Sequence, residues 1–286
     1  MQDLAGKICV VTGANTGIGK ETARGLASRG ATVILACRDA QKGEAARADL
    51  AASTGRQDLR VIPLDLSDLD SVRAFAATLR AELPRIDVLV NNAGVWTTKR
   101  GTTKQGFETT FGVNHLGTFL LTQELLPLLE KSPAGRVVTL SSSLHYRGKM
   151  QWDDLQSEKR GFSGPRAYNQ SKLANVLFTL ELARRLAGTK VSAFAVHPGV
   201  VATELARSYP KFLVKVFHLF LLSPEQGAAC SLHAATAPEL ERKTGLYFEK
   251  SRPRTPSARA RDEEAQERLW RLSEQLVSGA TAAQAA

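Results

Sequence analysis

Tyr168 and Lys172, a tyrosine and a lysine four positions apart, are the side chains of this sequence best suited to moving a proton. Tyr168 alone among the four tyrosines has a lysine at the fourth following position. On a helix such residues share one face, so the phenol and the ammonium would lie side by side. An adjacent cation stabilises a phenolate and lowers the pKa of the tyrosine. The pair predicts an acid/base group, although the same spacing also occurs in surface aromatic–cation pairs.

A glycine-rich turn at residues 12–19 follows the first apolar run and precedes a helical pattern. Glycines allow a tight turn and a close approach of the backbone to a pyrophosphate, whose charge then lies at the helix N-terminus. The spacing is Gly-x-x-x-Gly-x-Gly, which departs from the common G-x-G-x-x-G pattern. We therefore expect dinucleotide contacts from six residues of the turn: Gly13, Asn15, Thr16, Gly17, Ile18 and Gly19.

The second apolar run ends in Ala36-Cys37-Arg38-Asp39, at the point where an acid would bind the ribose 2′-hydroxyl of NAD. Arg38 offers a planar set of donors that suits a 2′-phosphate. Asp39 is the counter-argument, but an aspartate that opens a helix is more simply an N-cap. The sequence therefore favours NADP(H) over NAD(H).

Further polar residues end two other apolar runs or interrupt a helical pattern. Residues 141–143 are all serine, residues 91–94 are Asn-Asn-Ala-Gly, and Asn114 lies inside a helical stretch. Each feature alone has an ordinary explanation, because serine forms turns and a buried amide needs hydrogen-bond partners. Together with Tyr168 they are expected to converge where the nicotinamide would lie.

Short β-branched runs alternate with longer helical patterns along the chain, which predicts β-α-β units. Strands are expected at residues 8–11, 32–35, 60–64, 87–90, 137–140, 191–196 and 245–248, and helices at 20–29, 41–51, 69–82, 114–129 and 167–186. The predicted fold is α/β: a single-domain, Rossmann-like, doubly wound parallel sheet with helices on both faces. Such sheets bind ligands beyond the carboxyl ends of their strands.

Length and composition suit one packed domain, which we place at residues 1–278, with a substrate lid at about 200–223 and a disordered tail at 279–286. The net charge of +10 comes from Lys and Arg spread along the chain, so no nucleic-acid partner is expected. The five histidines lack metal-ligand spacing, and no metal site is predicted.

Three widely spaced cysteines favour a reducing compartment, and we expect a cytoplasmic protein. The first strand-like run begins at residue 7, so neither an export signal nor an N-terminal anchor is expected. The apolar segment at 212–222 is about half the ~20 residues needed to span a bilayer. It is interpreted as a pocket wall, a buried core helix or a peripheral membrane contact.

These motifs, in this order, resemble those of the short-chain dehydrogenase/reductase family over nearly the whole chain: residues 12–19, 91–94, 141–143, 168–172 and 197–199. Within that family, residues 36–39, 113–117, 154–160, 171–175 and 267–270 resemble the retinol dehydrogenase-like branch, which reduces retinal and other aldehydes. The stretch between the serines and Tyr168 is longer than in a minimal member. Residues 145–166 are therefore expected to form an inserted loop at the substrate mouth.

The resemblance implies a role for each matching residue. Ser142 would hydrogen-bond the substrate oxygen, Tyr168 would exchange its proton, Lys172 would hold the nicotinamide ribose, and Asn114 would support a proton relay through water. Asp65 would bind the adenine. The remaining implied cofactor contacts are Leu66, Asn92, Ala93, Gly94, Pro198, Gly199, Val200 and Thr203.

The leading functional hypothesis is an NADP(H)-dependent oxidoreductase acting on an apolar aldehyde or ketone, retinal-like or lipid-derived, or on the corresponding alcohol. The alternative is a catalytically silent NADP(H)-binding sensor or interaction module. A third reading is a peripheral membrane protein docked through residues 212–222. The expected partner is a small apolar carbonyl or alcohol, and a homo-oligomer is left open.

Overall fold

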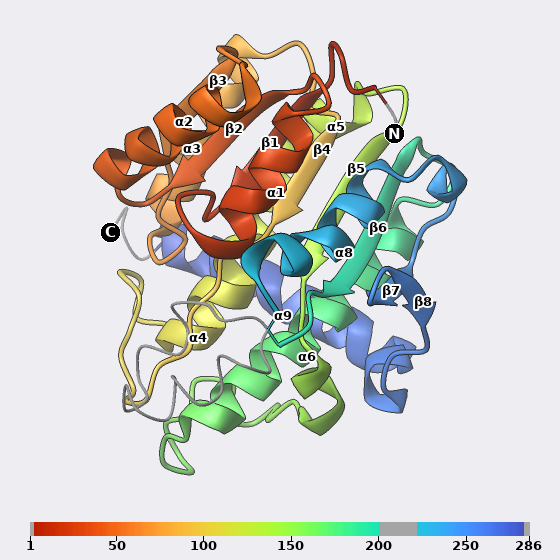
Figure 1. The fold of residues 1–286 in the computed structure, drawn as a ribbon. Helices are drawn as coiled ribbons and strands as arrows, with labels where there is room; N and C mark the ends of the chain where they lie inside the picture. Colours follow the sequence, from red (N-terminus) through yellow and green to blue (C-terminus); the bar gives the residue numbers. More distant parts are fainter. Residues whose placement is uncertain (1–2, 201–221, 283–286) are drawn as a thin grey trace.

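Within the described residues, eight strands form one sheet in the order β3-β2-β1-β4-β5-β6-β7-β8 (Figure 1). The computed structural model describes residues 3–200 and 222–282. Neighbouring strands are parallel, except that β8 is antiparallel to β7. The strands are β1 (Ile8–Thr12), β2 (Thr32–Cys37), β3 (Leu59–Pro63), β4 (Val88–Asn91), β5 (Gly135–Leu140), β6 (Val191–His197), β7 (Leu246–Glu249) and β8 (Arg252–Arg254).

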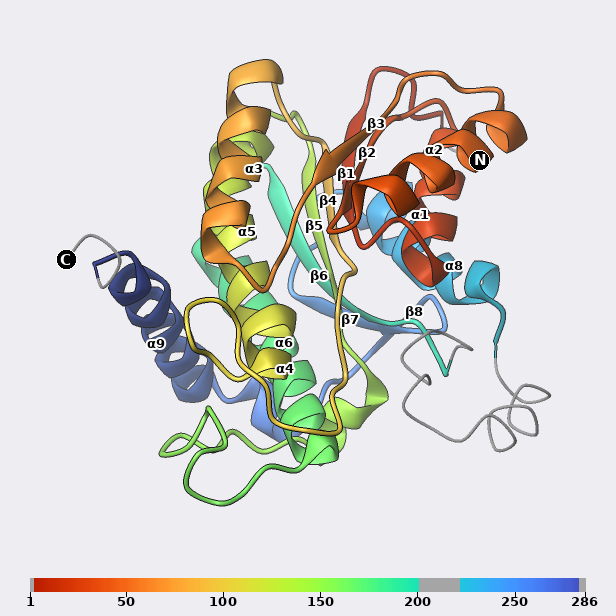
Figure 2. The ribbon, with the colours of Figure 1, turned by 90° about the vertical axis from the view of Figure 1, so that its left-hand side faces the viewer.

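Helices cover both faces of this sheet. Figure 2 shows α3, α5, α6 and α9 on one side and α1, α2 and α8 on the other. The helices are α1 (Gly17–Ala27), α2 (Ala40–Thr54), α3 (Leu69–Glu82), α4 (Thr109–Phe111), α5 (Thr118–Glu130), α6 (Gly164–Arg185), α8 (Pro224–Thr236) and α9 (Glu263–Ala282). Shorter turns are the π-helix η1 (Gly112–Gly117) and the 3₁₀ helices η2 (Ser143–Arg147), η4 (Pro238–Leu240) and η5 (Ala258–Arg261).

The central strands are buried along their length because both of their faces are covered. Every residue of β5 and β6 is buried. Successive side chains of β1 alternate between two hydrophobic cores: Val10 packs with the α3–α5–α6 layer, whereas Cys9 and Val11 pack with the α1–α2–α8 layer. This alternation follows from the two-residue period of a strand.

The predicted fold class is confirmed: the sheet is parallel apart from its last strand, and helices lie on both faces. Three features differ from the expected elements. The helix expected from residue 114 is instead α4, η1 and α5 in succession, and β8 and α9 were not predicted. A disordered tail was expected from residue 279, but α9 continues to Ala282.

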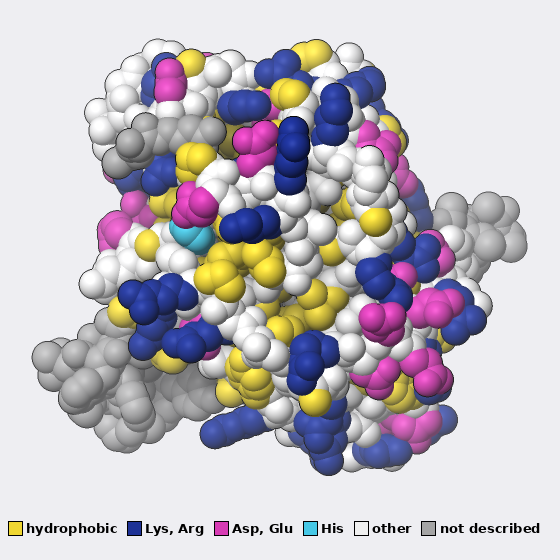
Figure 3. Space-filling view, turned by 90° about the vertical axis from the view of Figure 1, so that its right-hand side faces the viewer, with side chains coloured by type: hydrophobic (Ala, Val, Ile, Leu, Met, Phe, Trp, Pro, Cys, Tyr) yellow, Lys and Arg dark blue, Asp and Glu magenta, His cyan; other side chains and the backbone are white. Residues whose placement is uncertain are grey.

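Residues 201–221 lie outside the described part of the chain, and with them Thr203, most of the expected lid and nearly all of the apolar segment at 212–222. Of the helices that the structure describes, none has both the length and the apolar character required to cross a membrane. On the face drawn in Figure 3, Lys and Arg side chains are interspersed with Asp and Glu. Ion pairs such as Arg56–Asp58 and Arg184–Glu263 neutralise some of the basic side chains locally.

Candidate active site

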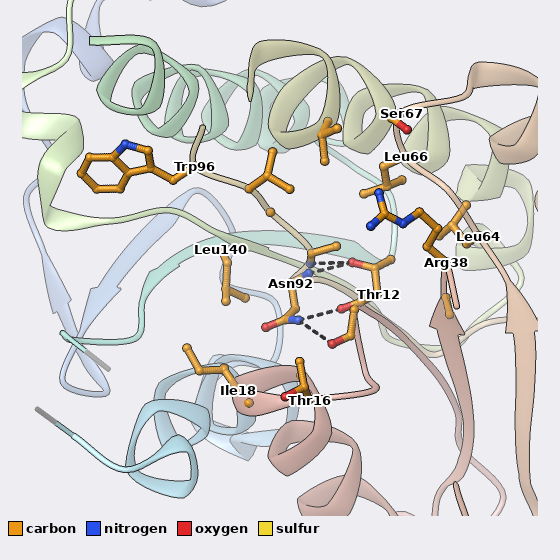
Figure 4. Close-up of a pocket in the computed structure, with 18 of the residues that line it drawn as sticks. Thr12, Thr16, Ile18, Arg38, Leu64, Leu66, Ser67, Asn92, Trp96 and Leu140 are labelled. Carbon is orange, nitrogen blue, oxygen red and sulfur yellow. Dashed lines mark hydrogen bonds between the residues drawn. The ribbon is translucent and has the colours of Figure 1, made fainter. Parts of the chain in front are cut away.

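The site lies where the strand order reverses, between the carboxyl ends of β1 and β4. Doubly wound sheets bind ligands at this switch point. A cavity of about 710 Å³ opens here, within the range of ~300–1,000 Å³ that is usual for cofactor sites (Figure 4). Among the predicted site residues, its lining includes Gly13, Asn15, Thr16, Gly17, Ile18, Gly19, Arg38, Asp65, Leu66, Asn92, Ala93, Gly94, Tyr168, Lys172 and Pro198.

The glycine turn is tightly packed against the loop that follows β4. Gly13 has a φ of +66°, in the region that favours glycine, and its N–H donates to Ala36 O at 2.8 Å. A methyl group at Gly19 would clash with the Gly13 carbonyl and the Asn92 amide. Glycine at position 19 therefore lets the first turn of α1 approach the strand ends, which leaves a backbone cradle suited to a pyrophosphate.

Thr12, which the sequence reasoning missed, fixes the Asn92–Gly94 loop to the end of β1. Its hydroxyl accepts hydrogen bonds from the backbone N–H groups of Asn92 and Ala93, both at 2.9 Å. The Asn92 side-chain amide donates to Thr12 O at 2.7 Å, as Figure 4 shows. The cavity floor is thus held by hydrogen bonds between two neighbouring strand ends.

Arg38 follows β2 and lines the cavity, where Figure 4 shows it beside Leu64 and Leu66. Among the residues that the structure describes, none forms a hydrogen bond or an ion pair with its guanidinium. Asp39 caps α2, as predicted, by accepting from Lys42 N–H at 3.1 Å. Asp65 accepts from the N–H and the hydroxyl of Ser67 at 2.9 and 2.6 Å. Arg38 is therefore available to an anionic ligand, whereas the two aspartates already have partners.

Tyr168 and Lys172 lie on α6 and are 7% and 4% exposed, respectively. The Lys172 Nζ lies 5.5 Å from the centroid of the Tyr168 ring and donates to Leu140 O at 3.2 Å. Burial raises the pKa of Tyr168 to about 12 and lowers the pKa of Lys172 to about 8. The shift of the tyrosine is opposite to the expected one, because removal from water disfavours the phenolate.

Asn114 lies in the π-helix η1, is fully buried and does not line the cavity. Its Oδ1 accepts from Val95 N–H at 2.7 Å, and its Nδ2 donates to Val95 O at 2.9 Å and to Ser171 Oγ at 3.0 Å. Two of these bonds join η1 to the loop after β4, and the third joins η1 to α6. The Asn114 side chain therefore holds the loop after β4 and α6 in place relative to each other.

The serines that follow β5 differ in their surroundings. Ser141 lines the cavity and donates to Lys172 O at 2.7 Å. Ser142 is half-buried, and its Oγ accepts from Leu144 N–H at 3.2 Å, which leaves its own proton free to be donated. Ser142, Gly199 and Val200 are not among the residues that line the cavity.

Trp96 is a further part of the site that the sequence reasoning missed. Its indole stacks on the Tyr168 ring, with a centroid separation of 4.5 Å and an interplanar angle of 17°. It also lines the cavity, as do the apolar Val95 and Val113. A single aromatic residue in a loop has no periodicity that would mark it; the only signal was its place two residues after the Asn-Asn-Ala-Gly segment.

A parallel sheet with a dinucleotide cradle at its switch point, and a phenol facing the same cavity, defines the class of nucleotide-dependent oxidoreductases. The family model for short chain dehydrogenases matches residues 7–213. The chain therefore belongs to the short-chain dehydrogenase family, whose members are oxidoreductases that use a nicotinamide cofactor.

Similar proteins confirm the resemblance to the retinol dehydrogenase-like branch. The chain is 51% identical to mouse retinol dehydrogenase 12 over 96% of its own length and 87% of that protein. It is 46% identical to human retinol dehydrogenase 13, over 96% and 85% of the two chains. A short chain dehydrogenase from Shigella flexneri, solved in complex with NADP, has 30% identity and a TM-score of 0.72, and the match covers 88% of this chain and all 100% of that one.

Proposed function

We propose that this oxidoreductase is NADP(H)-dependent and transfers a hydride between the nicotinamide and the carbonyl or alcohol carbon of an apolar aldehyde or ketone, retinal-like or lipid-derived. The names of the related retinol dehydrogenases support this substrate class. So do the apolar side chains Val95, Trp96 and Val113 in the cavity lining, of which Trp96 stacks on Tyr168.

The cofactor assignment rests on the surroundings of the Arg38 guanidinium. Its guanidinium lines the cavity at the end of β2 and has no partner among the described residues. A neighbouring carboxylate would instead favour the 2′-hydroxyl of NAD, but Asp39 is engaged at the N-terminus of α2. A ribose 2′-phosphate would give Arg38 the charged partner that it lacks.

The glycine turn and the Asn92–Gly94 loop would hold the cofactor, which supplies or accepts the hydride when bound. Tyr168 would exchange a proton with the substrate oxygen, and the Ser142 hydroxyl would donate to the same oxygen. Lys172 would provide a positive charge beside the phenol, at 5.5 Å from the ring centroid. Trp96 would cover one face of that ring and exclude water from it.

The alternative of a silent NADP(H)-binding module is less well supported. Tyr168 and Lys172 both face the cofactor cavity. A pure binding protein needs neither a buried phenol nor a buried amine there, and both are costly to bury in their charged forms.

The buried free thiols Cys9, Cys37 and Cys230 are consistent with the cytoplasmic location that we propose.

A first experiment tests the cofactor. Arg38→Ala is expected to raise the KM for NADPH about 10- to 100-fold, the effect of losing a charge-assisted hydrogen bond, and to leave the KM for NADH unchanged. Arg47→Ala is the matched control, because Arg47 lies on α2, pairs with Glu44 and does not line the cavity. Equal effects of Arg38→Ala on both cofactors would overturn the preference for NADP(H).

A second experiment tests the reaction. NADPH oxidation is measured with retinal, medium-chain aldehydes, lipid-derived aldehydes and bulky ketones. Tyr168→Phe is expected to abolish turnover and to retain NADPH binding. Turnover by Tyr168→Phe would refute its assignment, and NADPH binding without turnover of any carbonyl would favour the silent module.

A further inference from the structure

His145 is a fully buried histidine in η2, three residues after Ser142. It contacts the main-chain carbonyl of Ser142 twice: its backbone N–H donates at 3.0 Å, and its ring Nδ1 lies 2.8 Å from the same oxygen. A carbonyl oxygen only accepts hydrogen bonds, so Nδ1 must carry the proton. The ring and the backbone N–H of His145 thus both donate to the Ser142 carbonyl.

The other ring nitrogen of His145 is also engaged. The backbone N–H of Ser257 donates to Nε2 at 3.2 Å. Ser257 lies between β8 and η5, far along the chain from the serine run. Because Nε2 accepts and Nδ1 donates, the ring is neutral with a defined tautomer, and its burial lowers the pKa of His145 accordingly.

Aromatic rings hold the imidazole in this orientation. The Tyr146 ring centroid lies 4.0 Å from that of His145, and the Tyr247 centroid lies 4.8 Å away with its ring nearly edge-on. Tyr146 also binds the segment between β8 and η5 that contains Ser257, because its hydroxyl donates to Thr255 O at 2.7 Å. The two contacts to the segment are separate, so each can be removed alone.

We infer that His145 is a positioning residue for Ser142. The inference rests on the proposed function. Two hydrogen bonds to Ser142 O fix the plane of the Ser142–Ser143 peptide. The extended conformation of Ser142 (φ −157°, ψ 155°) is thereby held, and with it the direction in which its hydroxyl points. A catalytic donor misplaced by about 1 Å can cost about 100-fold in rate.

Three substitutions separate the two halves of this contact. His145→Asn keeps an amide nitrogen near the Nδ1 position, and His145→Gln keeps one near Nε2, whereas His145→Leu keeps neither. Relative to the wild type, we expect kcat to fall about 10- to 100-fold in His145→Leu and His145→Gln, with the KM for NADPH unchanged. In His145→Asn, kcat should recover to within about threefold, an effect that packing alone does not produce.

Tyr146→Phe is the control for a merely structural role, since it loosens the same segment without touching Ser142, and its kcat should match the wild type. Equal losses of kcat in His145→Asn and His145→Leu, or a Tyr146→Phe loss as large as that of His145→Leu, would overturn the inference.

Amide hydrogen exchange of residues 141–149 provides a second test that needs no substrate. It should accelerate in His145→Leu and stay at the wild-type rate in His145→Asn, whichever carbonyl the wild type turns over; equal exchange in both variants would also refute the inference.

Discussion

Lys172 is expected to destabilise the folded protein at neutral pH, because its ammonium is buried with the Leu140 carbonyl as its hydrogen-bond acceptor. Burial lowers its pKa from 10.5 to about 8. Each pKa unit corresponds to about 1.4 kcal/mol, so the charged form costs roughly 3 kcal/mol relative to the unfolded chain. This penalty is fully present below pH 8 and is lost as the pH rises from 8 towards 10.5.

The sign follows from the protons bound in each state. Between the two pKa values the unfolded chain keeps the lysine proton and the folded protein does not, so stability rises with pH. Tyr168 acts in the opposite direction but at higher pH, because burial raises its pKa from 10.0 to about 12. The folded protein then retains a proton that the unfolded chain loses, and stability falls above pH 10. Burial also raises the pKa values of the thiols Cys9, Cys37 and Cys230 above 9.0, which lowers stability from about pH 9 upward. The lysine is therefore isolated by comparing the wild type with a Lys172 variant at each pH, since the thiols are common to both.

Lys172→Met removes the buried charge and the hydrogen bond to Leu140. With about 3 kcal/mol gained and about 1 kcal/mol lost, the variant should be about 2 kcal/mol more stable than the wild type at pH 7. By pH 10 this advantage should vanish, although the variant loses turnover at every pH. Urea unfolding of both proteins at pH 7 and pH 9.5 measures the difference.

Lys190→Met, at an exposed lysine, is the control and should show no such pH dependence. Two results would refute the reasoning about Lys172: a Lys172→Met variant less stable than the wild type at pH 7, or a stability difference that stays constant between the two pH values. Either would mean that the ammonium has a compensating partner in the folded protein.

Three further outcomes are expected. Gly19→Ala should abolish NADPH binding, measured by fluorescence titration, because the added methyl clashes with the Gly13 carbonyl; wild-type affinity would contradict this. Asn114→Ala should cost about 3 kcal/mol of unfolding free energy, since three hydrogen bonds at about 1 kcal/mol each are lost; a change below 1 kcal/mol would show that water replaces them. Trp96→Ala should admit water to Tyr168, so its pKa should fall towards its ordinary value and the alkaline limb of the pH–rate profile should move to lower pH, with Trp96→Phe as the control; an unmoved profile would refute the shielding role.

Sequence periodicity predicted the sheet well because its strands are buried on both faces and read as continuous apolar runs. It missed β8, whose Arg-Pro-Arg sequence is exposed at every position and forms only an edge strand. It also missed α9, although a signal was present. The buried residues Leu269, Trp270, Ser273 and Val277 recur at helical spacing, and Trp270 packs against Phe178 of α6.

The cofactor side of the site was predictable because it depends on local backbone chemistry, and the substrate side was less so because it depends on long-range contacts. A glycine turn after a strand identifies itself from a few adjacent residues. The hydrogen bonds of His145 with Ser142 and Ser257, by contrast, join segments more than a hundred residues apart. The Trp96–Tyr168 stack likewise requires the loop after β4 to meet α6, which Asn114 brings about.

The raised pKa of Tyr168 conflicts with a role in proton exchange only if the residue is considered alone. The Lys172 Nζ lies 5.5 Å from the centroid of the Tyr168 ring, close enough for the ammonium to attract the negative charge of a phenolate. Burial acts against this charge, because the rise in the pKa of Tyr168 from 10.0 to about 12 corresponds to a cost of roughly 3 kcal/mol for the phenolate. When Lys172 is charged, its attraction therefore opposes the effect of burial on Tyr168, and a charged tyrosine in turn favours the charged lysine. The two residues titrate as a pair, in which the loss of the phenol proton and the retention of the lysine proton stabilise each other. Lys172 therefore lowers the pKa of Tyr168 only in the charged state of the pair. Lys172→Met should remove this effect on the pKa together with the activity.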